Sequence, residues 1–165
     1  MRDDFAAAYE KKDIVEMTKK KAEMLSLIDD LDELLATQPS MLLGKWIADA
    51  RKLGKNAREK DYYEKDAKML ITVWGGKQRS LNDYGNRSWA GLTGDFYKKR
   101  WEMFLNDVLL SVKEGTKFDE KAFKQKTYKF EDQWVDEHKI FNSAPVGDSF
   151  QKSRLLMLKY SPYFY

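Results

Sequence analysis

The chain has 165 residues, the length of one domain that buries a core without disulfide or metal staples. Its 30 basic and 27 acidic residues give a net charge of +3 with the two signs interleaved, whereas a nucleic-acid-binding stripe gathers one sign on one face. The absence of cysteine excludes disulfides and thiolate metal sites without assigning a compartment, and no apolar run approaches the roughly 20 residues that a membrane span needs.

The N-terminal third predicts two helices. Residues 2–11 fit a short helix, and a long amphipathic helix follows from Asp13 to Ala36. Asp13 is a suitable N-cap, and Pro39 stops the helix because proline cannot continue the hydrogen-bond ladder. The apolar residues at helical spacing are Ile14, Met17, Met24, Leu27, Ile28, Leu31, Leu34 and Leu35.

Two further helices precede the middle of the chain. Ser40 is a plausible cap for a helix that carries Trp46 and Ile47 and ends at Gly54. The next helix runs from about Asn56 to Thr72, and Trp74 follows its end.

The C-terminal half predicts three helices. Asp95 is expected to cap the first, which Gly115 closes, and Asp119 starts the second, with Phe123, Phe130 and Trp134 facing inward. A loop over 142–147 leads to the last helix, 148–160. The apolar stripe of the first of these helices is Tyr97, Trp101, Phe104, Leu105, Val108 and Val112.

No alternating run is long enough to predict a strand. Short connections between amphipathic helices imply antiparallel neighbours. The sequence therefore predicts one all-α domain over residues 1–165, an antiparallel multi-helix bundle with a glycine- and aromatic-rich loop near residues 74–92.

This loop is the unusual feature of the sequence. Solvated loops favour small polar residues, so Trp74, Tyr84 and Trp89 must plug into the core or line a concave surface. A tryptophan at a helix end is most often core, but beside two glycines its ring face can stay open to a flat ligand. Tyr84, with Asn82 and Asn86, would then supply hydrogen bonds to that ligand.

Asp83 lies inside the same loop and admits two roles. It can accept hydrogen bonds from nearby backbone N–H groups as a cap or turn residue, which is the preferred interpretation, or it can contact a ligand directly.

Other polar residues carry weaker signals. His138, the single histidine, is expected on a solvated helix face, so zinc and triad chemistry lack ligands. The run Gly75-Gly76-Lys77 follows a helix rather than a strand and matches no phosphate loop. The acidic residues over 29–33 point in different directions on a helix, which argues against a metal site. We expect neither a metal nor a cofactor.

Several motifs in order resemble the C-terminal region of alpha-N-acetylglucosaminidase, a glycoside hydrolase family. They are Leu42-Leu43-Gly44-Lys45-Trp46-Ile47-Ala48-Asp49-Ala50-Arg51, Ala67-Lys68-Met69-Leu70-Ile71-Thr72-Val73-Trp74-Gly75, Leu81-Asn82-Asp83-Tyr84-Gly85-Asn86-Arg87-Ser88-Trp89-Ala90-Gly91-Leu92, Arg100-Trp101-Glu102-Met103-Phe104 and Leu158-Lys159-Tyr160-Ser161-Pro162.

The resemblance implies an all-helical domain that follows a small α/β domain and a (β/α)8 barrel. Members of the family hydrolyse terminal α-linked N-acetylglucosamine with retention, in animals from heparan sulfate. The acid and nucleophile that this chemistry needs lie in the barrel, so the resemblance implies that this chain holds no catalytic residue and is inactive alone.

The resemblance also implies that the helical domain packs on the barrel and completes the wall of the substrate pocket. Trp74, Asp83, Tyr84 and Asn86 match the family's motif there and are the candidate substrate-binding residues. Trp89 is expected to pack, because family members can carry leucine at this position. Members act in lysosomes or in the bacterial extracytoplasmic space, and neither nucleic acid nor a membrane is an expected partner.

A second reading remains open. The chain would then be a stand-alone helical protein-interaction module, with the aromatic loop as a protein-binding patch.

Overall fold

The computed structural model describes residues 1–76 and 79–164. Within these residues it is built from helices, with no β-sheet, so the predicted all-α class is confirmed. The elements are α1 (Arg2–Glu10), α2 (Ile14–Leu35), α3 (Leu43–Arg51), α4 (Ala57–Ile71), the π-helix η2 (Leu92–Tyr97), α5 (Lys98–Glu114), α6 (Glu120–Asp136), α7 (Ser149–Tyr160) and the 3₁₀ helix η3 (Ser161–Tyr163).

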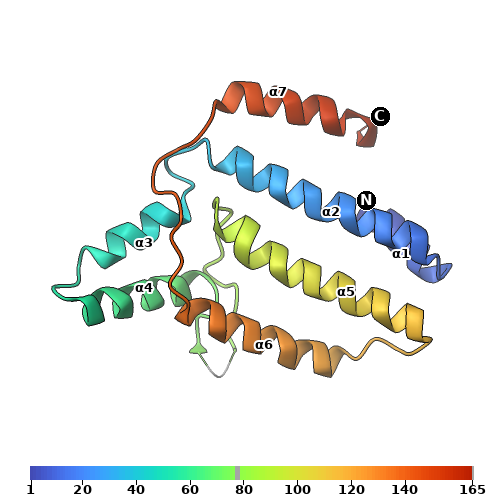
Figure 1. Cartoon of the computed structure of the whole chain (residues 1–165), viewed down its shortest axis with the longest axis horizontal. Coiled ribbons are helices and arrows are strands. Elements are labelled where there is room, and N and C mark those ends of the chain that lie inside the picture. The colour runs from blue at the N-terminus through green and yellow to red at the C-terminus, as the bar shows by residue number, and fades with distance from the viewer. Residues whose placement is uncertain (77–78, 165) are drawn as a thin grey trace.

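The helices α7, α2, α5 and α6 lie side by side in that order, and each runs antiparallel to its neighbour (Figure 1). The short helix α1 packs on α2, and α3 and α4 form an antiparallel pair at one end of the molecule. The antiparallel arrangement expected from the short connections is therefore confirmed.

The N-caps predicted at Asp13 and Asp119 are confirmed, and Asp148 also proves to be an N-cap. The side chain of Asp13 accepts a hydrogen bond from the Glu16 amide at 3.0 Å, and Asp119 and Asp148 cap α6 and α7 in the same way. Gly115 ends α5 in the left-handed conformation, with φ of 66°, as a C-terminal glycine does. Each of these interactions spans only a few residues of sequence.

The predicted cap at Ser40 is wrong. Helix α3 begins at Leu43, and its N-cap position is held by Leu42, whose side chain cannot cap. The chain stays extended here because it pairs with the end of the aromatic loop. The Ala90 amide donates to the Met41 carbonyl at 2.8 Å, and the Leu43 amide donates to the Ala90 carbonyl at 3.1 Å.

The predicted cap at Asp95 is also wrong. Asp95 lies inside η2, and its carboxylate accepts from the Trp134 indole at 2.6 Å. The amides at the start of η2 are instead satisfied by Asp32 of α2. Its Oδ1 accepts from Gly91 at 2.8 Å and from Gly94 at 2.7 Å, so a distant helix supplies the cap.

The acidic run of α2 diverges as expected. Asp29 pairs with Lys98 of α5 at 2.6 Å, whereas Asp30 and Glu33 pair with lysines of α7. Together with Asp32, these carboxylates tie α2 to its neighbours on two sides.

Two main clusters form the core. The first joins α3, the end of α4, η2 and the end of α6 and consists of Leu43, Ile47, Ile71, Val73, Leu92, Phe96, Trp134 and Val135. The second joins α1, α2 and α5 and consists of Phe5, Ala8, Met17, Leu105, Val108 and Leu109. The loop between α4 and η2 starts and ends at the first cluster. Among the described helices, none has the length and apolar character needed to cross a bilayer.

Candidate functional site

Two aromatic side chains stand out on the loop between α4 and η2. The rings of Trp74 and Tyr84 meet edge to face, with centroids 5.4 Å apart and an interplanar angle of 65°. Trp74 is 40% exposed and Tyr84 is 72% exposed. The structure thus places both residues at the surface rather than in the core, and edge-to-face contact is a favourable geometry for two rings.

Glycines shape the loop beneath this pair. Gly75 and Gly76 both have positive φ, 102° and 56°, which turns the chain directly after Trp74. At Gly85 a Cβ atom would lie 2.5 Å from the Leu70 carbonyl oxygen and 3.7 Å from the Trp74 ring. A side chain at this position would therefore push the loop away from the end of α4 and from Trp74.

The Asp83 side chain pairs with Arg100 rather than serving as a cap or turn acceptor, so the preferred sequence interpretation is wrong. Both of its carboxylate oxygens lie 2.8 Å from Nη1 of Arg100 on α5. Its backbone amide donates to the Thr72 carbonyl at 2.7 Å, and its φ is +60°. Asp83 thereby ties the loop to α5 while its side chain remains partly exposed.

A buried acid on α6 completes this anchorage. Glu131 is 1% exposed, and its Oε2 accepts from Arg79 at 3.1 Å and from Asn82 at 3.0 Å. Its Oε1 lies 3.3 Å from Nε of Arg100. Burial raises the pKa of Glu131, against the opposing effect of the two arginines. Asn82 thus points inward to α6 and not toward a ligand.

The two remaining candidates of the loop, Asn86 and Trp89, differ in their burial. Asn86 is exposed shortly after Tyr84 in the chain, and its backbone amide donates to the Asp83 carbonyl at 3.2 Å. Trp89 is half-buried against the core, with its ring centroid 5.6 Å from that of Trp46. The packing role expected for Trp89 is confirmed.

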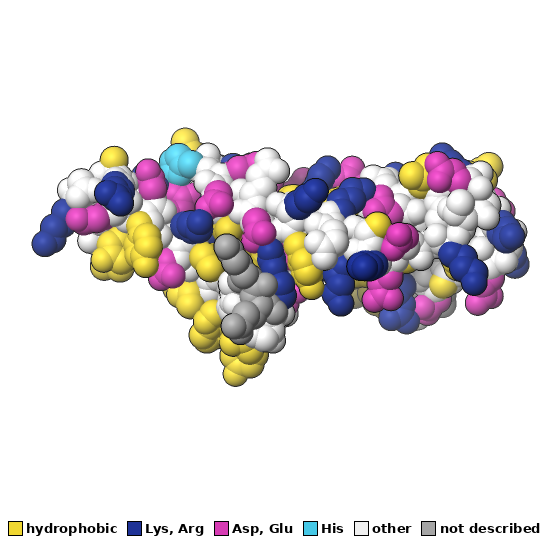
Figure 2. Space-filling view, turned by 90° about the horizontal axis from the view of Figure 1, so that it is seen from below, with side chains coloured by type: hydrophobic (Ala, Val, Ile, Leu, Met, Phe, Trp, Pro, Cys, Tyr) yellow, Lys and Arg dark blue, Asp and Glu magenta, His cyan; other side chains and the backbone are white. Residues whose placement is uncertain are grey.

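The loop protrudes from one broad face of the molecule. Figure 2 shows apolar side chains gathered on a projection from the molecule. The exposed large apolar residues of the loop are Trp74, Leu81 and Tyr84. Lys77 of the Gly75-Gly76-Lys77 run lies outside the described residues.

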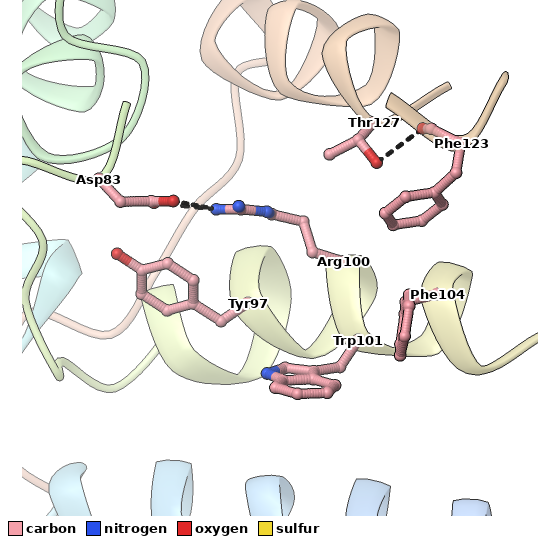
Figure 3. A pocket seen from close by; sticks show the side chains of 7 residues that line it. All are labelled: Asp83, Tyr97, Arg100, Trp101, Phe104, Phe123 and Thr127. Atoms are coloured by element: carbon pink, nitrogen blue, oxygen red, sulfur yellow. Dashed lines mark hydrogen bonds and ion pairs between the residues drawn. The ribbon is translucent and has the colours of Figure 1, made fainter. Parts of the chain in front are cut away.

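A cavity of about 350 Å³ opens next to the Asp83–Arg100 ion pair. Figure 3 shows Asp83 and Arg100 facing each other with the Tyr97 ring beside them, and the rings of Trp101, Phe104 and Phe123 further along. Trp101, which the sequence placed in the apolar stripe of its helix, is 43% exposed here. Burial, and then the negative charge of Asp83, raise the pKa of Tyr97 to about 12, so its hydroxyl stays protonated. The lining residues are Asp83, Tyr97, Arg100, Trp101, Phe104, Phe123 and Thr127.

His138 does not occupy a helix face, so that expectation is wrong. Helix α6 ends at Asp136, and Nδ1 of His138 lies 2.7 Å from Glu64 Oε2. Asp61, Glu64 and His138 have the spacing of a cation site among the described residues. However, Nη1 of Arg51 lies 2.8 Å from Asp61 and 2.6 Å from Glu64, so a guanidinium already pairs with both carboxylates.

Sequence reasoning missed Glu131 and Arg100. The signal for Glu131 was present, because Thr127, Glu131 and Trp134 follow helical spacing along the inward face of α6. An acid on such a stripe indicates a buried ion pair. Nothing in the sequence named its partners.

The fold and its protruding loop define an all-α domain that presents an anchored aromatic surface. The sequence profile of the family described as Alpha-N-acetylglucosaminidase (NAGLU) C-terminal domain matches residues 1–159. The chain belongs to this family, as the resemblance predicted.

Individual proteins similar to this chain support the same family assignment. The human Alpha-N-acetylglucosaminidase is 33% identical over 136 residues, which are 82% of this chain and 18% of the human protein. A family 89 glycoside hydrolase from Clostridium perfringens, solved with 2-acetamido-1,2-dideoxynojirmycin, matches 96% of this chain and 19% of its own at 28% identity and a TM-score of 0.83. A variant from the same organism, in complex with its substrate GlcNAc-alpha-1,4-galactose, matches 95% of this chain and 18% of its own at 27% identity and a TM-score of 0.82. The chain thus spans about a fifth of the length of these relatives.

Proposed function

We propose that residues 1–165 form one helical domain of a longer alpha-N-acetylglucosaminidase, packed on a (β/α)8 barrel that supplies the catalytic acid and nucleophile. The loop around Trp74 and Tyr84 forms part of the wall of the pocket for terminal α-linked N-acetylglucosamine. The observation that carries the proposal is this exposed aromatic pair, held on a projecting and anchored loop. Exposing two large aromatic rings to water is unfavourable, whereas a bound sugar would cover them and bury their apolar faces.

The chemistry of the loop suits a sugar. The open face of Trp74 packs against the C–H face of a pyranose ring, and the Tyr84 hydroxyl both donates and accepts hydrogen bonds. Asn86 adds an exposed amide close by. Asp83 keeps lone pairs free for a sugar hydroxyl, even with both oxygens bound to Arg100.

The role of such a wall is to orient the substrate. A rigid aromatic surface excludes water and holds the glycosidic bond in line with the two carboxylates of the barrel. Retaining hydrolysis requires those carboxylates to act from fixed positions on either side of the bond. The chain contributes binding and orientation, and the chemistry takes place on the other domain.

Helix α7 supports packing on the rest of the parent protein. It is bound to α2 through polar groups: Lys152 pairs with Glu33, and the Tyr160 hydroxyl donates to Asp30 at 2.6 Å. Its outer side leaves large apolar side chains in solvent, with Phe150 76% exposed. These exposed residues are Phe150, Leu155, Met157 and Leu158. Because the chain spans about a fifth of its relatives, the remainder of the parent is the natural cover for this surface.

Family membership also supports a location for the parent. It acts outside the cytoplasm, in the lysosome of an animal cell or the extracytoplasmic space of a bacterium. Fractionation of cells that express the full-length gene, with detection of this domain in each fraction, tests that location.

The test of function compares Tyr84→Ala and Trp74→Ala in the full-length enzyme with Tyr62→Ala. Tyr62 is the matched control, since it is an exposed ring of α4 in edge-to-face contact with Tyr63 at 5.8 Å, away from the loop. We expect kcat/KM for an aryl α-N-acetylglucosaminide to fall about tenfold or more in both loop variants, with a small change in melting temperature. The control keeps wild-type kcat/KM.

Two outcomes contradict the proposal. If Trp74→Ala loses stability and kcat/KM in proportion, Trp74 belongs to the core. If both loop variants retain full kcat/KM, the loop does not face the sugar, and the protein-interaction module becomes the better interpretation.

A further inference from the structure

The loop segment 79–84 has a backbone that needs support. Arg79 and Asp83 have φ of 56° and 60°, in the left-handed region that side chains other than glycine seldom adopt. Trp74 precedes this segment and Tyr84 ends it. The mutual orientation of the two rings therefore depends on what holds the segment in this conformation.

One carboxylate reaches both ends of the segment. Oε2 of Glu131 accepts from Arg79 and from Asn82, at 3.1 and 3.0 Å. Its Oε1 lies 3.3 Å from Arg100, and Arg100 in turn binds both oxygens of Asp83. Glu131 thus touches Arg79 directly and reaches Asp83 through a single intermediate side chain.

The surroundings make these contacts rigid. Glu131 lies on α6 between Thr127 and Trp134, both buried, so its own position is set by the core. The Arg79 guanidinium lies over the Tyr128 ring at 4.5 Å, one turn earlier on the same helix. Hydrogen bonds to a buried charge are stronger than those between neutral groups. Removing the Glu131 charge therefore deprives both Arg79 and Arg100 of a charged acceptor.

We propose that Glu131 is a positioning residue, whose carboxylate fixes the loop segment 79–84 and thereby the orientation of Trp74 and Tyr84. It does not touch the sugar and takes no part in proton transfer. The effect of Glu131 on the loop conformation is inferred from its contacts with Arg79, Asn82 and Arg100. The effect on substrate rests on the proposed function.

Hydrogen exchange on the 165-residue chain tests the effect on the loop. The Asp83 amide reports on the segment because it donates to Thr72, and the Leu105 amide reports on the core of α5. We expect Glu131→Gln, which keeps the side-chain size but removes the charge, to speed exchange at Asp83 about tenfold or more, and Leu105 several-fold less. The control is Asp136→Asn on the same helix, which breaks an exposed ion pair with Lys65 and leaves Asp83 unchanged.

A second variant guards against failure to fold. Asn82→Ala removes one contact with Glu131 and leaves the buried ion pairs intact, so the helices stay folded. The same selective acceleration at Asp83 supports the proposal. Unchanged exchange at Asp83 in both variants, or equal acceleration at Asp83 and Leu105, overturns it.

Kinetics of the full-length enzyme test the consequence for the sugar. We expect Glu131→Gln to lower kcat/KM roughly tenfold through kcat and KM together, because a loosened wall binds the sugar more weakly and no longer holds the glycosidic bond in line with the barrel carboxylates. If exchange at Asp83 accelerates while both constants stay at wild-type values, Glu131 still fixes the loop, but the loop does not face the sugar and the proposed function is wrong.

Discussion

Replacing Asp32 by alanine removes the cap that α2 supplies to η2. The Oδ1 of Asp32 accepts from the amides of Gly91 and Gly94, where the aromatic loop joins the core. Alanine leaves both amides without this acceptor in a partly buried site. We therefore expect Asp32→Ala to loosen the end of the loop and to destabilise the whole fold.

The expected loss can be worked out from these contacts. Each hydrogen bond to a charged acceptor contributes roughly 1.5–3 kcal/mol. Burial offsets part of this sum, because it raises the pKa of Asp32 and so disfavours the charged form. The net loss is about 2–4 kcal/mol, which corresponds to roughly 5–15 °C in melting temperature for a chain of this size.

Urea unfolding of the chain, followed by far-ultraviolet circular dichroism, measures this loss. The matched control is Asp29→Ala, one turn earlier on α2, where the acid pairs with Lys98 at 2.6 Å and is half-exposed. An exposed pair of this kind contributes about 0–1 kcal/mol. If Asp32→Ala costs no more than Asp29→Ala, the two amides do not depend on Asp32 and the reasoning is refuted.

Two other variants test the loop and the buried ion pairs. Gly85→Ala should lower the free energy of unfolding by about 1–3 kcal/mol in urea melts, because its Cβ would lie 2.5 Å from the Leu70 carbonyl oxygen. A loss below that of Gly76→Ala, where a Cβ meets nothing within 4 Å, would contradict the close approach. Glu64→Gln should cost roughly 3–5 kcal/mol at neutral pH by leaving Lys68 buried without its partner. Burial acts to raise the pKa of Glu64, but hydrogen bonds from its cationic neighbours outweigh it and hold the pKa below 4.5. The stability it contributes is full above about pH 4.5 and is lost as the pH falls through the lower folded value, so the gap between wild type and variant should close in acid melts; a constant gap would contradict the ion pair.

The helices could be predicted because their signals are local. Asp13, Asp119 and Asp148 each bind an amide three residues ahead, so spacing along the sequence contains the whole interaction. Ser40 and Asp95 look the same in sequence, but neither caps a helix. In both places the backbone amides at the helix start are hydrogen-bonded by a segment that is distant in sequence.

The candidate site also has a part that the sequence predicted and a part that it did not. Its aromatic composition showed that the loop presents side chains, and the structure places Trp74 and Tyr84 at the surface. The anchors were not visible, because Arg79 and Glu131 are 52 positions apart. A charge on the inward face of α6 indicated burial without naming its partner.

The sequence by itself determined the all-α class, most helix limits and the family, because each depends on periodicity, local caps or ordered motifs. The tertiary structure decided which polar groups meet. It assigned Asp83 to Arg100, Asp32 to η2 and Glu131 to the loop. Pairing of charges across helices depends on how amphipathic faces pack in space, and sequence spacing within one helix cannot specify that packing.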